Sequence, residues 1–152
     1  MLSSIVPEGD IAFKVFQDGS KKSIGASDGA GIKAPIVVLA DEETKGTIEI
    51  FVLAVKELEN GKFVGTVTGG KGSVQEAFKL SDGSAILLTT AVYSSRGGRT
   101  YDTTGVFPNY DVKLTENGED KTLIMGDLNT DTQLRKALEV ALAATKSAEI
   151  SK

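Results

Sequence analysis

Apolar and polar positions in the first forty residues follow a pattern typical of strands separated by turns. Residues 11–16 are largely apolar in alternation and end at Gln17-Asp18-Gly19, which predicts a strand and a turn. Residues 21–24 can pair back on this strand as a hairpin, and the glycine-rich residues 26–33 predict a loop. Residues 35–40 form a continuous β-branched run, which indicates a strand buried on both faces of a partly parallel sheet.

A helix is predicted over residues 47–60, closed by Asn60-Gly61. Its apolar residues cover most of the circumference, so it is expected to lie buried across the sheet. The polar segment 41–46 precedes it and places Gly46 beside the helix N-terminus. Backbone N–H groups and the helix dipole favour negative charge there, and many nucleophiles and oxyanion holes are built at such places.

The second half of the chain alternates strands with turns and ends in a helix. Strands are predicted over residues 62–68, 73–80, 84–93 and 110–114, with an extended segment at 99–103 and a short strand at 122–125. Asp82-Gly83 indicates a hairpin between the second and third of these strands.

A capping box, with Thr130 as the cap and Gln133 three residues later, opens the last helix. Its expected apolar face consists of Leu134, Ala137, Leu138, Ala141 and Leu142. Residues 146–152 are expected to be a frayed tail. The sequence therefore predicts one mixed α/β domain over residues 1–145, with a central helix and a peripheral C-terminal helix.

Composition narrows the possible functions. The chain has 152 residues, 40% of them hydrophobic and 25% charged, which suits one globular domain with a real core. A net charge of −4 gives no basic surface for nucleic acid, and no apolar run is long enough for membrane insertion. Histidine and cysteine are absent, which excludes Ser-His and Cys-His catalysis, disulfides and zinc sites with the usual ligands.

A lysine among glycines, in Thr68-Gly69-Gly70-Lys71-Gly72, is the most suggestive local motif. A lysine held against glycine backbone loses water easily and can then act as a general base. From this stretch alone, an exposed surface turn is the favoured explanation of Lys71.

Taken together, the motifs resemble the protease core of the C-terminal processing (tail-specific) serine peptidases, in order and in register over residues 2–142. The matching segments are Pro35 to Leu39, Glu49-Ile50, Gly70-Lys71-Gly72-Ser73-Val74-Gln75, Asp82-Gly83-Ser84, Thr89-Thr90-Ala91 with Tyr93, Gly98-Arg99, Gly105 to Asn109, and Asp131 with Gln133, Leu134, Ala137 and Leu138. The resemblance implies a ClpP/crotonase-like α/β core with a mixed β-sheet and a buried central helix. It also implies that this chain lacks the upstream part and PDZ module of such proteins.

The same resemblance implies a site at which Lys71 is the base and Gln75 supports it. The nucleophilic serine of the family lies 25 residues before the lysine, and that count leads to Gly46 in this chain. A Ser-Lys hydrolase needs an attacking hydroxyl at this place. Thr44 and Thr47 flank the vacant position as possible substitutes, but each is displaced from it. The sequence therefore predicts a peptidase-like domain without catalysis, which binds an unstructured peptide or a protein C-terminus.

Two alternatives stay open. The chain could be an active serine-type endopeptidase fragment that needs upstream segments, or a non-catalytic structural or assembly module. The resemblance implies an extracytoplasmic location for the full-length protein, and the oligomeric state is left undetermined.

Several other residues have simpler explanations. Glu49 matches a family position, yet the helix dipole alone accounts for an acid in a first turn. Arg96 and Arg99 could hold a carboxylate, although turn arginines are usually solvated. Asp127, Asn129 and Asp131 alternate as in a calcium loop, but the glycine and distal glutamate of such a loop are missing. Neither a metal nor a cofactor is predicted.

Overall fold

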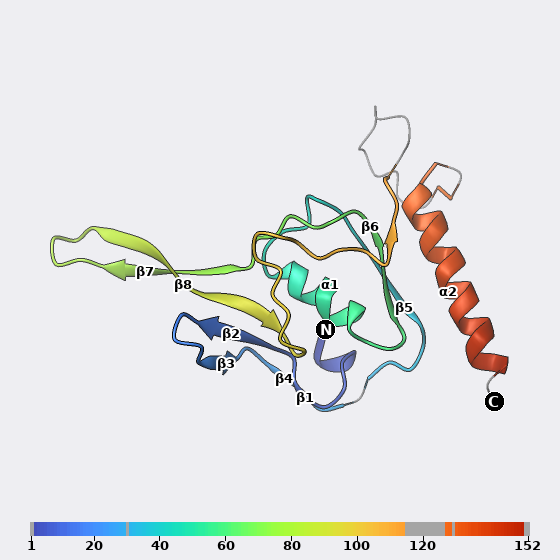
Figure 1. Cartoon of the computed structure of the whole chain (residues 1–152), viewed down its shortest axis with the longest axis horizontal. Helices are drawn as coiled ribbons and strands as arrows, with labels where there is room; N and C mark the ends of the chain where they lie inside the picture. The colour runs from blue at the N-terminus through green and yellow to red at the C-terminus, as the bar shows by residue number, and fades with distance from the viewer. Residues whose placement is uncertain (1, 30, 115–126, 129, 151–152) are drawn as a thin grey trace.

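A computed structural model describes residues 2–29, 31–114, 127–128 and 130–150 (Figure 1). In chain order the elements are η1 (Leu2–Ser4), β1 (Gly9–Asp10), β2 (Ala12–Phe16), β3 (Lys21–Ser23), β4 (Ala26–Ser27), β5 (Ile36–Ala40), α1 (Ile48–Lys56), β6 (Gly61–Gly65), β7 (Ser73–Lys79), β8 (Ala85–Ser95), β9 (Tyr110–Asp111) and α2 (Thr132–Ile150). The predicted mixed α/β class is confirmed. Within the described residues, no helix is long and apolar enough to cross a membrane.

A parallel sheet, in the order β5-β6-β9, lies between the two helices. Neighbouring residues of β6 point to opposite faces of this sheet, as strand geometry requires. Phe63 packs in a cluster with Ile50 and Leu53 of α1, whereas Val64 packs with Ala137 and Val140 of α2. Helices thus cover both faces of β6. The strand predicted to be buried on both faces, β5, is less enclosed than expected: Ala40 is buried, residues 36–38 are half-buried and Leu39 is 40% exposed.

The remaining long strands form an antiparallel sheet in the order β3-β2-β8-β7. The hairpin predicted at Asp82-Gly83 is confirmed: Gly83 has φ +88°, and the Asp82 carboxylate accepts hydrogen bonds from the backbone and hydroxyl of Ser84. Within β8, only Ala91 to Ser95 pair with β2. The outer part of β7 and β8 consequently extends from the body as a two-stranded ribbon (Figure 1).

Helix α1 is buried as predicted but is shorter than the predicted 47–60, because it ends at Lys56. The Glu57 carboxylate accepts hydrogen bonds from Ser95 and Gly97, so the residue after the helix is tied to the end of β8. Gly61 then passes close beneath the helix, where a Cβ atom would lie 1.8 Å from the Val55 carbonyl oxygen. Only glycine permits this approach, which turns the chain directly into β6.

The predicted start of α2 is wrong by one residue. Asp131, not Thr130, caps the helix, since its Oδ1 accepts the Leu134 N–H at 2.8 Å. The Gln133 side chain donates to the Val112 carbonyl instead of closing a capping box.

The predicted apolar face of α2 is also partly wrong. Gln133, Ala137 and Val140 are buried against the parallel sheet, whereas Leu138 and Leu142 are exposed. The backbone remains helical to Ile150, where a frayed tail from residue 146 was expected.

Two further strand predictions and one loop prediction are only partly met. Strand β9 covers two of the five residues predicted at 110–114, and of the segment 99–103 only Thr100 forms a bridge, with Ser94. Residues 26–27, placed in a loop, pair with β1. The strand predicted at 122–125 lies outside the described residues, as does Asn129.

Candidate functional site

Gly46, at the predicted nucleophile position, lies directly before the buried helix. Gly46 has φ +81° and stands two residues ahead of Ile48, the first residue of α1. A Cβ atom at Gly46 would meet no atom within 4 Å, so a side chain at this place has free space. The backbone conformation is nevertheless one that L-residues with a Cβ atom seldom adopt.

Glu49 is the central residue of the site, and it is fully buried. Its Oε2 accepts the N–H of Gly46 at 2.9 Å and that of Lys71 at 2.8 Å. Its Oε1 accepts the Gly70 N–H at 2.8 Å and the Thr68 hydroxyl. One carboxylate therefore holds the N-terminus of α1 and the glycine-lysine loop together.

This arrangement changes the expectation for the helix N-terminus. The negative charge that such a place favours is supplied by Glu49 of the same helix. Because the Gly46 N–H donates to Glu49, this group is not directed outward as an oxyanion donor. The sequence signal was the acid three residues after Gly46, a spacing that lets a first-turn side chain reach back to the backbone before the helix.

Two further side chains fix this junction. The Tyr101 hydroxyl donates to the Gly46 carbonyl oxygen at 3.0 Å, and burial, with the nearby charge of Glu49, raises the pKa of Tyr101. The Thr68 hydroxyl donates to Glu49 and accepts the Val106 N–H at 2.8 Å. Loops that are far apart in sequence thereby converge on the start of α1.

Lys71 lies in a loop whose backbone is closely held. A Cβ atom at Gly70, which has φ +70°, would approach the Gly105 nitrogen to 2.8 Å, and the Gly72 N–H donates to the Asp102 carboxylate. The Lys71 side chain is exposed and, within the described part of the chain, has no hydrogen-bond or ion-pair partner. The structure thus brings the Lys71 backbone next to Gly46 and leaves its amine accessible to a ligand.

Gln75 is less closely connected to this centre. It lies exposed on β7, opposite Thr89, next to an irregularity of the strand pairing between Val74 and Gln75. No hydrogen bond joins it to Lys71 among the residues described. Its predicted supporting role stays a prediction.

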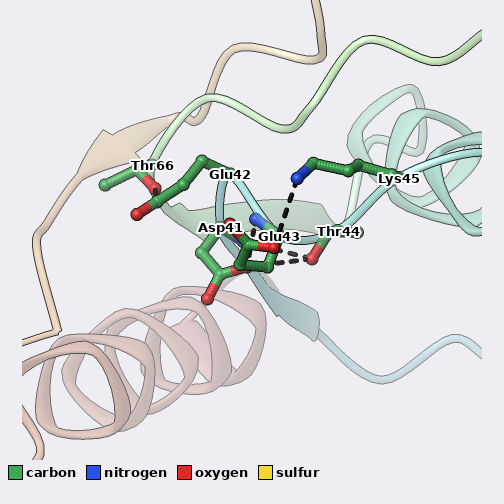
Figure 2. A network of polar contacts seen from close by, with 6 residues as sticks. All are labelled: Asp41, Glu42, Glu43, Thr44, Lys45 and Thr66. Carbon is green, nitrogen blue, oxygen red and sulfur yellow. Dashed lines mark hydrogen bonds and ion pairs between the residues drawn. The ribbon is translucent and has the colours of Figure 1, made fainter. Parts of the chain in front are cut away.

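The two threonines beside Gly46 have different surroundings. The Thr44 hydroxyl points toward the Asp41 carboxylate, to which it donates at 3.3 Å, within the loop network of Figure 2. In the same network Glu42 accepts the Thr66 hydroxyl and Lys45 pairs with Glu43.

Thr47 is exposed and caps no backbone N–H with its side chain. It borders a pocket of about 320 Å³ that Ile50, Tyr93 and Lys14 also line. Thr47 is therefore the more accessible of the two hydroxyls.

Among the residues described, no group of three or more acidic side chains is arranged to hold a metal ion. Asp131, the last residue of the alternating acidic segment, instead serves as the cap of α2.

Comparison with known proteins identifies the family. Residues 1–112 match peptidase family S41. The chain is 30% identical over 133 residues to the carboxy-terminal processing protease CtpA of Bacillus subtilis, covering 84% of this chain and 28% of that protein. The photosystem II D1 C-terminal processing protease superposes with a TM-score of 0.67 at 31% identity, over 74% of this chain and 29% of the other.

A lipoprotein of Streptococcus agalactiae also superposes, with a TM-score of 0.59 at 29% identity, over 73% of this chain and 43% of the other. The chain thus spans less than half the length of each of these proteins. The matched residues contain the whole junction among Gly46, Glu49 and Lys71. By sequence and fold, the chain belongs to peptidase family S41.

Proposed function

We propose that this chain is a non-catalytic domain of the S41 peptidase family that binds extended peptides at the Lys71 loop. The observation that carries the proposal is the pairing of an intact junction with a missing hydroxyl. Glu49 holds the backbones of Gly46 and Lys71 together, while position 46 has no side chain that could attack a carbonyl.

The lost nucleophile accounts for the proposed lack of catalysis. Removing the serine of a serine protease lowers kcat by about a million-fold. Thr44 donates to Asp41, and Thr47 is one position further along the chain, so neither hydroxyl replaces one at position 46. A displacement of about 1 Å already costs on the order of a hundred-fold in rate.

Peptide binding does not need the nucleophile. An extended peptide can pair with an exposed strand edge through its main chain. The exposed Lys71 amine lies two residues before β7, the last strand in the order of the antiparallel sheet. It can therefore attract a peptide carbonyl or carboxylate at that edge.

The direct test compares the natural chain with Gly46→Ser in two assays, hydrolysis of a flexible peptide and labelling by a serine-reactive phosphonate. We expect no turnover or labelling by the natural chain, and labelling of Gly46→Ser that decreases at least ten-fold when Lys71→Ala is added. Gly46→Ala serves as the matched control, because it shares the strain of the positive φ, about 1–2 kcal/mol, without a hydroxyl.

Turnover by the natural chain that Thr47→Val abolishes would refute the proposal and establish a threonine nucleophile. Peptide binding is measured in parallel by fluorescence anisotropy, and its absence would favour a purely structural module. We include in the proposal an extracytoplasmic location of the full-length protein, which the similarity to a streptococcal lipoprotein supports.

A further inference from the structure

The outer part of the β7–β8 hairpin has an apolar face without a covering element in the described structure. Register places Phe78 opposite Ile86 and Glu76 opposite Leu88, so these side chains share one face, and alternation adds Leu80 to it. Phe78, Leu80, Ile86 and Leu88 are each 43–49% exposed. We call the outer part of the hairpin the arm, and these four residues the apolar face of the arm.

The opposite face of the arm is different. Ala77 lies opposite Leu87 there, Lys79 opposite Ala85 and Gln75 opposite Thr89. Leu87 is the single bulky apolar side chain among them and is 59% exposed. The arm is therefore asymmetric, with all but one of its bulky apolar side chains on one side.

A ribbon of this kind is not stable by itself in water. Isolated two-stranded hairpins are marginal, and clustered exposed apolar side chains usually mark an interaction surface. At the base of the arm, Lys14 pairs with Glu76 at 3.9 Å and connects it to β2. Beyond that point Figure 1 shows the hairpin projecting from the body.

A second copy of the chain fits this surface poorly. Four half-exposed side chains offer a few hundred Å² per copy, well below the roughly 800 Å² per partner of a stable protein–protein interface. An extended peptide needs less area, because main-chain hydrogen bonds along a strand edge supply part of its affinity.

The position of the arm also favours a peptide. Among the described residues, no strand pairs with the outer edge of β7. A peptide strand added at this edge would place every second side chain beside Phe78 and Leu80. The same strand would run toward Lys71, which precedes β7 by two residues.

We propose that the apolar face of the arm, with the free edge of β7, binds extended peptides that carry apolar side chains at alternate positions. This inference rests on the proposed peptide-binding function and names its substrate class. The arm binds the apolar side chains of the peptide, and the Lys71 loop contacts the end of the peptide that lies nearer the body of the domain.

The test is a binding titration with three dye-labelled ten-residue peptides, measured by fluorescence anisotropy. One alternates valine with threonine, the second has serine in place of valine, and the third keeps the first sequence with alternate amides N-methylated. We expect the first peptide to bind at least ten-fold more tightly than either of the others. Phe78→Ser with Ile86→Ser should abolish this preference, whereas Leu87→Ser, on the opposite face, should retain it within two-fold.

Circular dichroism and thermal melting test whether each variant folds. If the double variant does not fold, the milder single change Leu88→Ser replaces it. If the natural chain binds none of the peptides, both this inference and the proposed function fail. If it binds all three equally, and the arm variants change nothing, only the inference fails. Sedimentation that shows a dimer lost in Phe78→Ser but not in Leu87→Ser would overturn it in favour of a second copy.

Discussion

Glu49 shows how one side chain can organise a site at the scale of a single residue. Its two oxygens accept three backbone N–H groups and a hydroxyl, which come from Gly46 and from the segment 68–71. Hydrogen bonds to a charged group are stronger than neutral ones, and the donors would be left unpaired without it. Glu49 is therefore expected to matter for stability even in a domain without catalysis.

Replacing this residue by its neutral isostere, Glu49→Gln, should lower the free energy of unfolding by about 2–4 kcal/mol. The amide NH₂ would face backbone donors at one of the two oxygen positions. Urea denaturation measures the change. Glu43→Gln is the matched control in the loop before α1, exposed and paired only with Lys45 in the described contacts, and should cost less than about 0.5 kcal/mol. Equal losses for the two variants would contradict this role of Glu49.

Helix α2 illustrates the scale of the element, at which its capping and its buried face are decided. The capping box predicted Thr130 as the cap, but Asp131 accepts the Leu134 N–H. Within the described part of the chain, the Thr130 hydroxyl donates only to the Asp127 carbonyl oxygen, at 3.4 Å. Independently of the cap, the buried side chains of this helix are Gln133, Ala137 and Val140, and the last two pack with Val64 of the parallel sheet.

We accordingly expect Asp131→Ala to destabilise the domain by about 1 kcal/mol, the usual cost of a lost helix cap. Thr130→Ala should change the free energy of unfolding by less than about 0.5 kcal/mol. Chemical denaturation followed by circular dichroism compares the two. A larger loss for Thr130→Ala would restore the capping box inferred from sequence.

At the scale of the whole molecule, Tyr101 connects the segment after β8 to the start of α1. It is nearly completely buried, and its hydroxyl donates to the Gly46 carbonyl oxygen. Burial and the charge of Glu49 raise the pKa of Tyr101 in the folded state, so folding favours the neutral phenol. The stability that this contributes is complete below the unfolded tyrosine pKa of about 10 and is lost as the pH rises above it.

The natural chain should therefore lose its stability advantage over Tyr101→Phe above about pH 10, by up to roughly 1.4 kcal/mol per pH unit. Below that pH the advantage should be constant and near 1 kcal/mol, the net value of one hydrogen bond. Denaturation midpoints between pH 7 and 11 provide the comparison. Tyr110→Phe, at an exposed tyrosine, is the control, and a parallel slope in both variants would exclude Tyr101 as its source.

Local pattern was sufficient for much of this protein. The apolar run at residues 36–40 predicted strand β5, and the apolar circumference of α1 predicted a buried helix. The Asp82-Gly83 turn predicted the hairpin. Each of these features follows from side-chain periodicity or turn geometry within a few residues. The spacing from Gly46 to Lys71, with its family resemblance, led to the candidate site, although its chemistry stays a proposal. The length of short strands such as β9 was overestimated, because a strand ends where its partner strand no longer provides backbone hydrogen bonds.

Tertiary structure alone decided the role of Glu49, the cap of α2 and the exposure of the arm. Glu49 accepts hydrogen bonds from Gly70 and Lys71, which lie more than twenty residues later in the sequence. No local pattern specifies that contact. Both Thr130 and Asp131 are of residue types that suit a helix cap, and only the folded chain shows that Asp131 accepts the Leu134 N–H. The apolar face of the arm follows from β2 pairing with only one end of β8, since burial depends on which segments meet in space.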